Sequence, residues 1–126
     1  MLKFLIIIFL SFALQSSTTP VFIAAKSGQT YHLSVIPRKE NMYFIICLEA
    51  KLNNDWSYVT LDIQRKFTSV PIANHVQKNI TFKCTYYLND IKKYELSKKT
   101  PYRFVVKYGY GEEHLNNRLV SRAFLH

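Results

Sequence analysis

The sequence is short of acidic residues and lacks the common catalytic motifs. Its 126 residues include 8 Asp and Glu against 17 Lys and Arg, which gives a formal charge of +9 at pH 7. No serine-nucleophile elbow, HExxH zinc motif or phosphate loop is present. Most glycosidases need two opposed carboxylates, which are hard to supply from so few acidic residues. We therefore expect a protein that is not an enzyme.

Cysteine is also scarce. Only Cys47 and Cys84 are present, and neither has a second Cys or a His at metal-ligand spacing. We therefore expect no metal site and no cofactor. In an oxidising compartment, two cysteines by themselves favour one disulfide.

The one long apolar run lies at the start of the chain, at residues 4–14, after a short basic start and before small and polar residues. This layout predicts a secretory signal peptide over residues 1–18, followed by a single domain over residues 20–126. The run is shorter than the ~20 residues of a spanning helix, so we expect an exported, extracellular protein without a transmembrane segment. An uncleaved anchor is the alternative.

The positive charge persists in the mature chain, because cleavage removes only Lys3 and leaves 16 Lys and Arg against 8 acidic residues. Such a surplus favours anionic partners such as sulfated glycans or anionic lipid. Export makes nucleic acid the least expected of them. The alternative is that the charge only maintains solubility. The sequon Asn79-Ile80-Thr81 makes Asn79 a candidate glycosylation site in this setting.

Short alternating segments fill the rest of the chain. Apolar and polar residues alternate at about residues 29–37, 42–50, 56–67, 70–76, 79–88, 101–108 and 118–126, with turn-forming clusters between most of them. Only residues 86–96 suggest a turn or two of helix. The pattern predicts an all-β fold, a sandwich of two antiparallel sheets. Within residues 60–67, it predicts a strand that buries Leu61 and Ile63 and presents Asp62, Gln64 and Lys66.

Taken in order, these segments resemble a galectin carbohydrate-recognition domain from about Val21 to His126. The family's opening pattern is a Gly-Gln pair, a proline turn and Phe-x-Ile-x-Leu, here Gly28, Gln29, Pro37, Phe44, Ile46 and Leu48. Residues 59–67 and 71–74 are similar to two sugar-binding strands of the family, and residues 95–106 and 116–126 to its later strands. The resemblance implies a jelly-roll sandwich with a glycan site on one concave sheet. An immunoglobulin-like sandwich is the alternative fold.

The resemblance also implies which residues occupy the sugar-binding positions. Asp62 stands in place of the family's His, Gln64 in place of Asn, and Lys66 in place of Arg, whereas Asn74 is kept. Lys83 takes the place of a Glu. A lysine lacks the planar two-pronged grip of an arginine, so ordinary β-galactoside binding is not expected.

The resulting candidate carbohydrate site has a positive bias and suits an acidic or sulfated glycan or glycoprotein. It consists of Asp62, Gln64, Lys66, Asn74, Lys83 and Trp56. Trp56 would either stack on a sugar ring or lie partly buried at the edge of the strand. The alternative is a solvated face without a ligand, in a secreted protein-interaction or lipid-carrier module. Because sandwich edge strands often pair, a homodimer remains open.

The resemblance changes the expectation for the two cysteines. In the galectin strand order, the strands of Cys47 and Cys84 are separated by two others, so their Cα atoms would lie ~14 Å apart. A disulfide tolerates only about 7 Å. The lectin fold therefore implies two free thiols, whereas an immunoglobulin-like sandwich would favour a bridge between its sheets.

Overall fold

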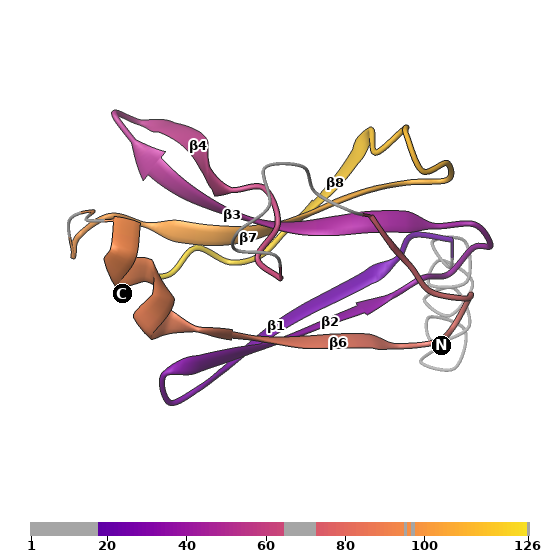
Figure 1. Cartoon of the computed structure of the whole chain (residues 1–126), viewed down its shortest axis with the longest axis horizontal. Coiled ribbons are helices and arrows are strands. Elements are labelled where there is room, and N and C mark those ends of the chain that lie inside the picture. Colours follow the sequence, from indigo (N-terminus) through magenta and orange to yellow (C-terminus); the bar gives the residue numbers. More distant parts are fainter. Residues whose placement is uncertain (1–17, 65–72, 95, 97, 126) are drawn as a thin grey trace, which may run out of the picture.

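The chain forms two antiparallel β-sheets that lie face to face (Figure 1). The computed structural model describes residues 18–64, 73–94, 96 and 98–125. Sheet A has the strand order β1 (Val21–Ser27), β2 (Thr30–Ile36) and β6 (Phe82–Tyr87). Sheet B has the order β4 (Asp55–Thr60), β3 (Tyr43–Leu52), β7 (Tyr102–Gly109) and β8 (Asn117–Val120), and the short β5 (Asn74–His75) also pairs with β3. The predicted all-β sandwich is confirmed.

Helical structure is confined, within the described ranges, to the short 3-10 helix η1 (Leu88–Tyr94). It falls inside residues 86–96, where the sequence suggests a turn or two of helix. None of the helices among the described residues is long and apolar enough to cross a membrane. Residues 1–17 of the predicted signal peptide lie outside the described residues.

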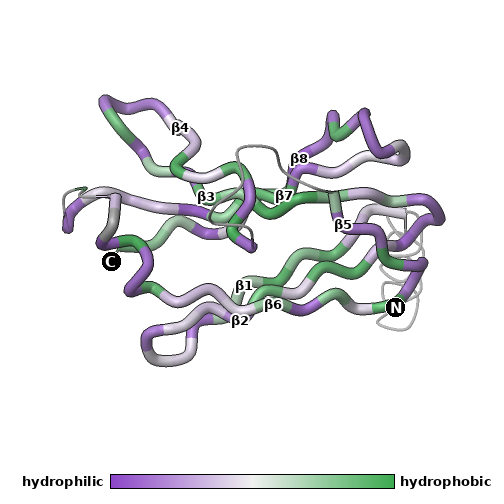
Figure 2. Tube along the Cα trace, viewed as in Figure 1, coloured by the Kyte–Doolittle hydropathy of each residue, from purple (hydrophilic) through white to green (hydrophobic). Residues whose placement is uncertain are grey.

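The core lies between the two sheets and is built from alternate residues of their strands. On β3, Phe44 and Ile46 are fully buried, and Phe44 meets Phe82 of sheet A edge to face at 5.1 Å between ring centroids. Tyr31 of β2 meets Phe104 of β7 in the same way at 5.2 Å. Figure 2 shows hydrophobic residues concentrated on the strands that face one another. Full burial of each such side chain contributes about 1.5–3 kcal/mol, so this interior fixes which face of each strand points outward.

The hairpin turns fall where the sequence clusters turn-forming residues. Asn53 and Asn54 form the two-residue turn between β3 and β4, with φ angles of 52° and 70°. Asparagine tolerates this left-handed conformation, and a pair of positive φ angles matches the right-handed twist of the flanking strands. Gly28 supplies a positive φ of 60° between β1 and β2.

The strand predicted through residues 60–67 is wrong, because β4 ends at Thr60. Thr60 pairs with Leu48, but Tyr58 pairs with the next residue, Glu49, so Val59 is an extra residue in a β-bulge. A bulge resets the alternation of side chains beyond it. The chain then turns: Leu61 is 41% exposed, whereas Asp62 is only 3% exposed, opposite to the predicted pattern.

Both cysteines are free, so the disulfide expected from composition is wrong and the prediction of two free thiols is confirmed. The reason differs from the one predicted, because the two residues lie in different sheets. Cys47 points to the outer face of sheet B, where it packs with Ile45 and Val105. Cys84 is on β6 and packs against the core between the sheets.

Candidate functional site

The outer face of sheet B, which points away from sheet A, carries a group of charged and aromatic side chains. Glu49 on β3 and Arg103 on β7 are directly paired, and Tyr58 on β4 pairs with Glu49 from the other side. Figure 1 shows β4 and β8 rising from sheet B on the side away from sheet A. We call this group the basic–aromatic cluster and define it as Trp56, Tyr58, Arg103, Lys107 and Arg118 around Glu49.

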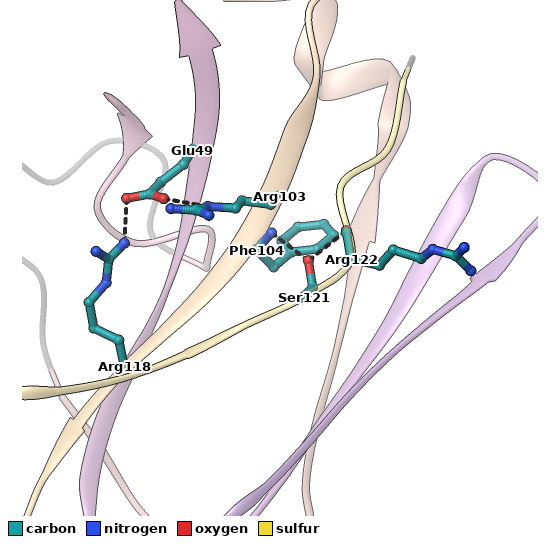
Figure 3. A network of polar contacts seen from close by, with 6 residues as sticks. All are labelled: Glu49, Arg103, Phe104, Arg118, Ser121 and Arg122. Atoms are coloured by element: carbon teal, nitrogen blue, oxygen red, sulfur yellow. Dashed lines mark hydrogen bonds and ion pairs between the residues drawn. The ribbon is translucent and has the colours of Figure 1, made fainter. Parts of the chain in front are cut away.

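Glu49 stands at the centre of the cluster and is bound by two arginines (Figure 3). The Arg103 Nε–H donates to Oε1 of Glu49 at 2.8 Å, and Arg118 Nη2–H donates to Oε2 at 2.7 Å. The Glu49 side chain is only 4% exposed, whereas those of Arg103 and Arg118 are 20% and 44% exposed. Because a carboxylate buried without a partner is costly, this one needs a cation beside it. The network therefore joins three strands, β3, β7 and β8.

The aromatic members fix two of the cations. The Arg103 guanidinium carbon lies 4.1 Å from the centroid of the Trp56 ring, and Lys107 Nζ lies 5.6 Å from that of Tyr58. Each such cation–π contact contributes about 0.5–1 kcal/mol at an exposed site. Arg103 is therefore held both by the Glu49 carboxylate and by the indole ring, which limits its rotamers. Tyr58 remains 44% exposed and presents an aromatic surface to solvent.

The cluster contains more positive charge than its own carboxylate neutralises. The cluster holds three cations, Arg103, Lys107 and Arg118, against the one carboxylate of Glu49, which is a formal excess of two positive charges. A guanidinium can donate up to five hydrogen bonds in a planar fork, and the bonds to Glu49 use one nitrogen of each arginine. The arrangement is suited to hold an anionic group beside an aromatic ring.

An apolar layer lies under these charges. Ile45, Cys47 and Val105 are buried together on the outer face of sheet B. The Cys47 thiol donates to the carbonyl oxygen of Leu61 at 3.3 Å. Burial raises the pKa of Cys47 to about 12, so the thiol stays protonated at neutral pH. This cysteine therefore serves as a packing residue rather than as a nucleophile.

Three of the residues predicted from the sequence form a local polar group, but not a strand ladder. Asn74 Nδ2–H donates to Oε1 of Gln64 at 2.9 Å and to the carbonyl oxygen of Phe44 at 3.3 Å. The Gln64 N–H donates to Oδ1 of Asp62 at 3.0 Å. Because Asp62 is buried, its carboxylate organises the turn after β4 instead of facing a ligand. Gln64 and Asn74 do come together, as predicted.

The other three predicted residues do not join that group. Lys83 pairs with Ser34 on the outer face of sheet A, in the opposite layer of the sandwich, so its assignment beside Asn74 is wrong. Lys66 lies outside the described residues. Trp56 is half-buried at the edge of sheet B, where it belongs to the basic–aromatic cluster.

The sequence analysis missed Glu49, Arg103, Lys107 and Arg118. A signal for two of them was present, because Arg103 and Lys107 alternate with the apolar residues of their strand and so must share the face opposite the core. Nothing in the local sequence connects them to Glu49 and Arg118, since those contacts depend on strand pairing. Among the residues that the structure describes, no group of three or more His, Cys, Asp or Glu could hold a metal ion.

No protein-family model, no curated protein and no solved structure matches this chain. The resemblance to galectins therefore rests on the sequence motifs alone.

Proposed function

We propose that this protein is an exported, galectin-like carbohydrate-binding β-sandwich whose ligand is an acidic glycan. The binding surface is the basic–aromatic cluster on the outer face of sheet B. The observation that carries the proposal is the pair of arginines on one buried carboxylate, with Trp56 and Tyr58 beside them.

The chemistry of the cluster favours a sulfated or carboxylated sugar. Guanidinium groups recognise carboxylate and sulfate-like oxygens through paired hydrogen bonds, and the charge assistance makes these bonds roughly twice as strong as neutral ones. A sugar ring also has an apolar face, for which the exposed ring of Tyr58 is a suitable platform. The surplus of positive charge in the mature chain, 16 Lys and Arg against 8 acidic residues, adds a long-range attraction for the same class of ligand.

Preorganisation further supports this surface. Glu49 and the Trp56 ring together restrict Arg103, so little rotamer entropy remains to be lost when a ligand binds. Arg118 is more exposed and its guanidinium is the more accessible of the two. We expect Arg118 and Lys107 to make the direct contacts, with Arg103 as the fixed centre of positive charge.

The test is binding of the secreted protein to an array of neutral, carboxylated and sulfated glycans, followed by affinity measurements on the best ligand. Arg118→Ala should weaken binding about tenfold, which corresponds to the loss of one charge-assisted hydrogen bond. Arg122→Ala is the matched control. The substitution removes the same charge, but the Arg122 side chain points away from Glu49 (Figure 3). Its affinity should stay within about twofold of wild type.

A second pair of variants distinguishes binding at the cluster from attraction by the overall positive charge of the protein. Lys107→Ala should weaken binding and reduce its salt dependence, whereas Lys83→Ala, on the outer face of sheet A, should change neither. Circular dichroism checks that each variant is folded. Equal losses for the cluster variants and their controls would overturn the proposed site. Failure to bind any acidic glycan at moderate salt would overturn the function and favour a protein-interaction module.

A further inference from the structure

The turn between β5 and β6 displays the sequon Asn79-Ile80-Thr81 in an accessible form. Residues 77–81 are all exposed. The Ile80 N–H donates to the carbonyl oxygen of Gln77 at 3.0 Å and closes a β-turn, in which Asn79 takes the third position with a φ of 65°. Asparagine is one of the few residues that adopt this conformation readily. We propose that Asn79 is N-glycosylated in the mature protein.

The contacts of Asn79 leave its acceptor nitrogen available. Arg38 Nη1–H donates to Oδ1 of Asn79 at 3.2 Å, and the backbone N–H of Asn79 donates to the carbonyl oxygen of Pro37 at 2.8 Å. Neither bond uses Nδ2, the atom to which the sugar is attached. Because Oδ1 remains an acceptor in the glycosylated amide, both contacts persist after modification. The folded turn therefore accommodates the glycan without rearrangement.

The donor is a lipid-linked oligosaccharide pyrophosphate of the secretory pathway. Nδ2 of Asn79 forms a bond to C1 of the first sugar, while the bond from C1 to the pyrophosphate oxygen breaks. The lipid pyrophosphate leaves with the bonding electron pair, and the proton lost from Nδ2 passes to a base of the transferase. This chemistry requires entry into the secretory pathway, so the inference rests on the signal peptide predicted over residues 1–18.

The position of the turn keeps the glycan away from the proposed ligand surface. In Figure 1 the segment that leads into β6 descends to the level of sheet A, whereas β4 and β8 rise from sheet B on the side away from sheet A. The sugar would also lie next to Ile80, which is 54% exposed, and screen it from other chains. Glycosylation of Asn79 is therefore compatible with an open basic–aromatic cluster.

The test is translation of the full chain, with its own N-terminal segment, in the presence of microsomes. A single upward mobility shift is expected, and peptide N-glycosidase should remove it and convert Asn79 to Asp. Asn79→Gln and Thr81→Ala should abolish the shift, whereas Thr81→Ser should retain it. Asn89→Gln, in an exposed position outside any sequon, is the matched control and should also retain it. Modification at this stage does not require folding, so an unstable variant still gives an answer.

Two outcomes would overturn the inference. One is a wild-type chain that is not modified, whether or not protection from added protease shows that it has entered the microsomes. The other is a mobility shift that survives in Asn79→Gln. The result is independent of the ligand surface. Unmodified Asn79→Gln protein should still bind an acidic glycan if the basic–aromatic cluster is the site. The two proposals therefore succeed or fail separately.

Discussion

Substituting both arginine partners of Glu49 by alanine should lower the free energy of unfolding by more than the sum of the two single substitutions. Arg118→Ala should cost about 1 kcal/mol, because that side chain is 44% exposed and its ion pair is partly screened by water. Arg103→Ala should cost about 2 kcal/mol, since it removes a more buried charged hydrogen bond and the stacking on Trp56. Either single variant leaves Glu49 one cationic partner.

The double variant leaves a carboxylate, with a side chain only 4% exposed, without either arginine. We expect a total loss of about 5 kcal/mol, the upper end for an uncompensated buried charge. Adding Glu49→Leu to the double variant should restore most of this loss, because an apolar side chain of similar size no longer requires a counter-charge.

The measurement is equilibrium unfolding in urea for the wild type, the single and double variants, and the triple variant. The coupling energy between the two arginine substitutions should be at least about 1 kcal/mol. Additive losses would mean that Glu49 is satisfied by water or by other groups. A triple variant no more stable than the double would show that the arginines, and not the orphaned carboxylate, determine the stability of this face.

Two further predictions concern residues outside the cluster. Gly109→Ala should destabilise the protein by about 1–3 kcal/mol in urea unfolding, because a Cβ there would overlap the backbone carbonyl oxygen of His114. Gly111→Ala, whose Cβ would meet only the His114 side chain at 3.4 Å, should be tolerated, and equal effects of the two substitutions would contradict the close approach. Burial raises the pKa values of Cys47 and Cys84 to about 12 and about 11, so a thiol reagent at pH 8 should react slowly with the native protein. After denaturation the reagent should titrate two thiols, and fewer than two would contradict the absence of a disulfide between these cysteines.

Much of the fold was predictable because most strands obey simple alternation. Residues 29–37 contain β2, and residues 42–50 and 101–108 cover most of β3 and β7. The prediction failed at Val59, since a bulge is defined by a partner strand and has no local signature. Beyond it, the expected exposure of Leu61 and Asp62 was reversed.

The candidate site was predictable only in part, for a related reason. Trp56 was identified from its position on the strand, and Gln64 and Asn74 do meet. By contrast, Glu49 and Arg118 are 69 residues apart in the sequence, and their contact exists only because β7 lies between β3 and β8. A pattern read along one strand does not reveal such a pair.

The ion pairs of Glu49 also have a consequence for how sheet B is assembled. A one-residue slip of β7 along β3 would turn Arg103 toward the interior and Phe104 toward water, and it would separate Arg103 from its carboxylate. A slip of β8 would carry Arg118 away in the same manner. One acidic side chain thus selects a single alignment of three neighbouring strands from the several that their backbone hydrogen bonds would permit.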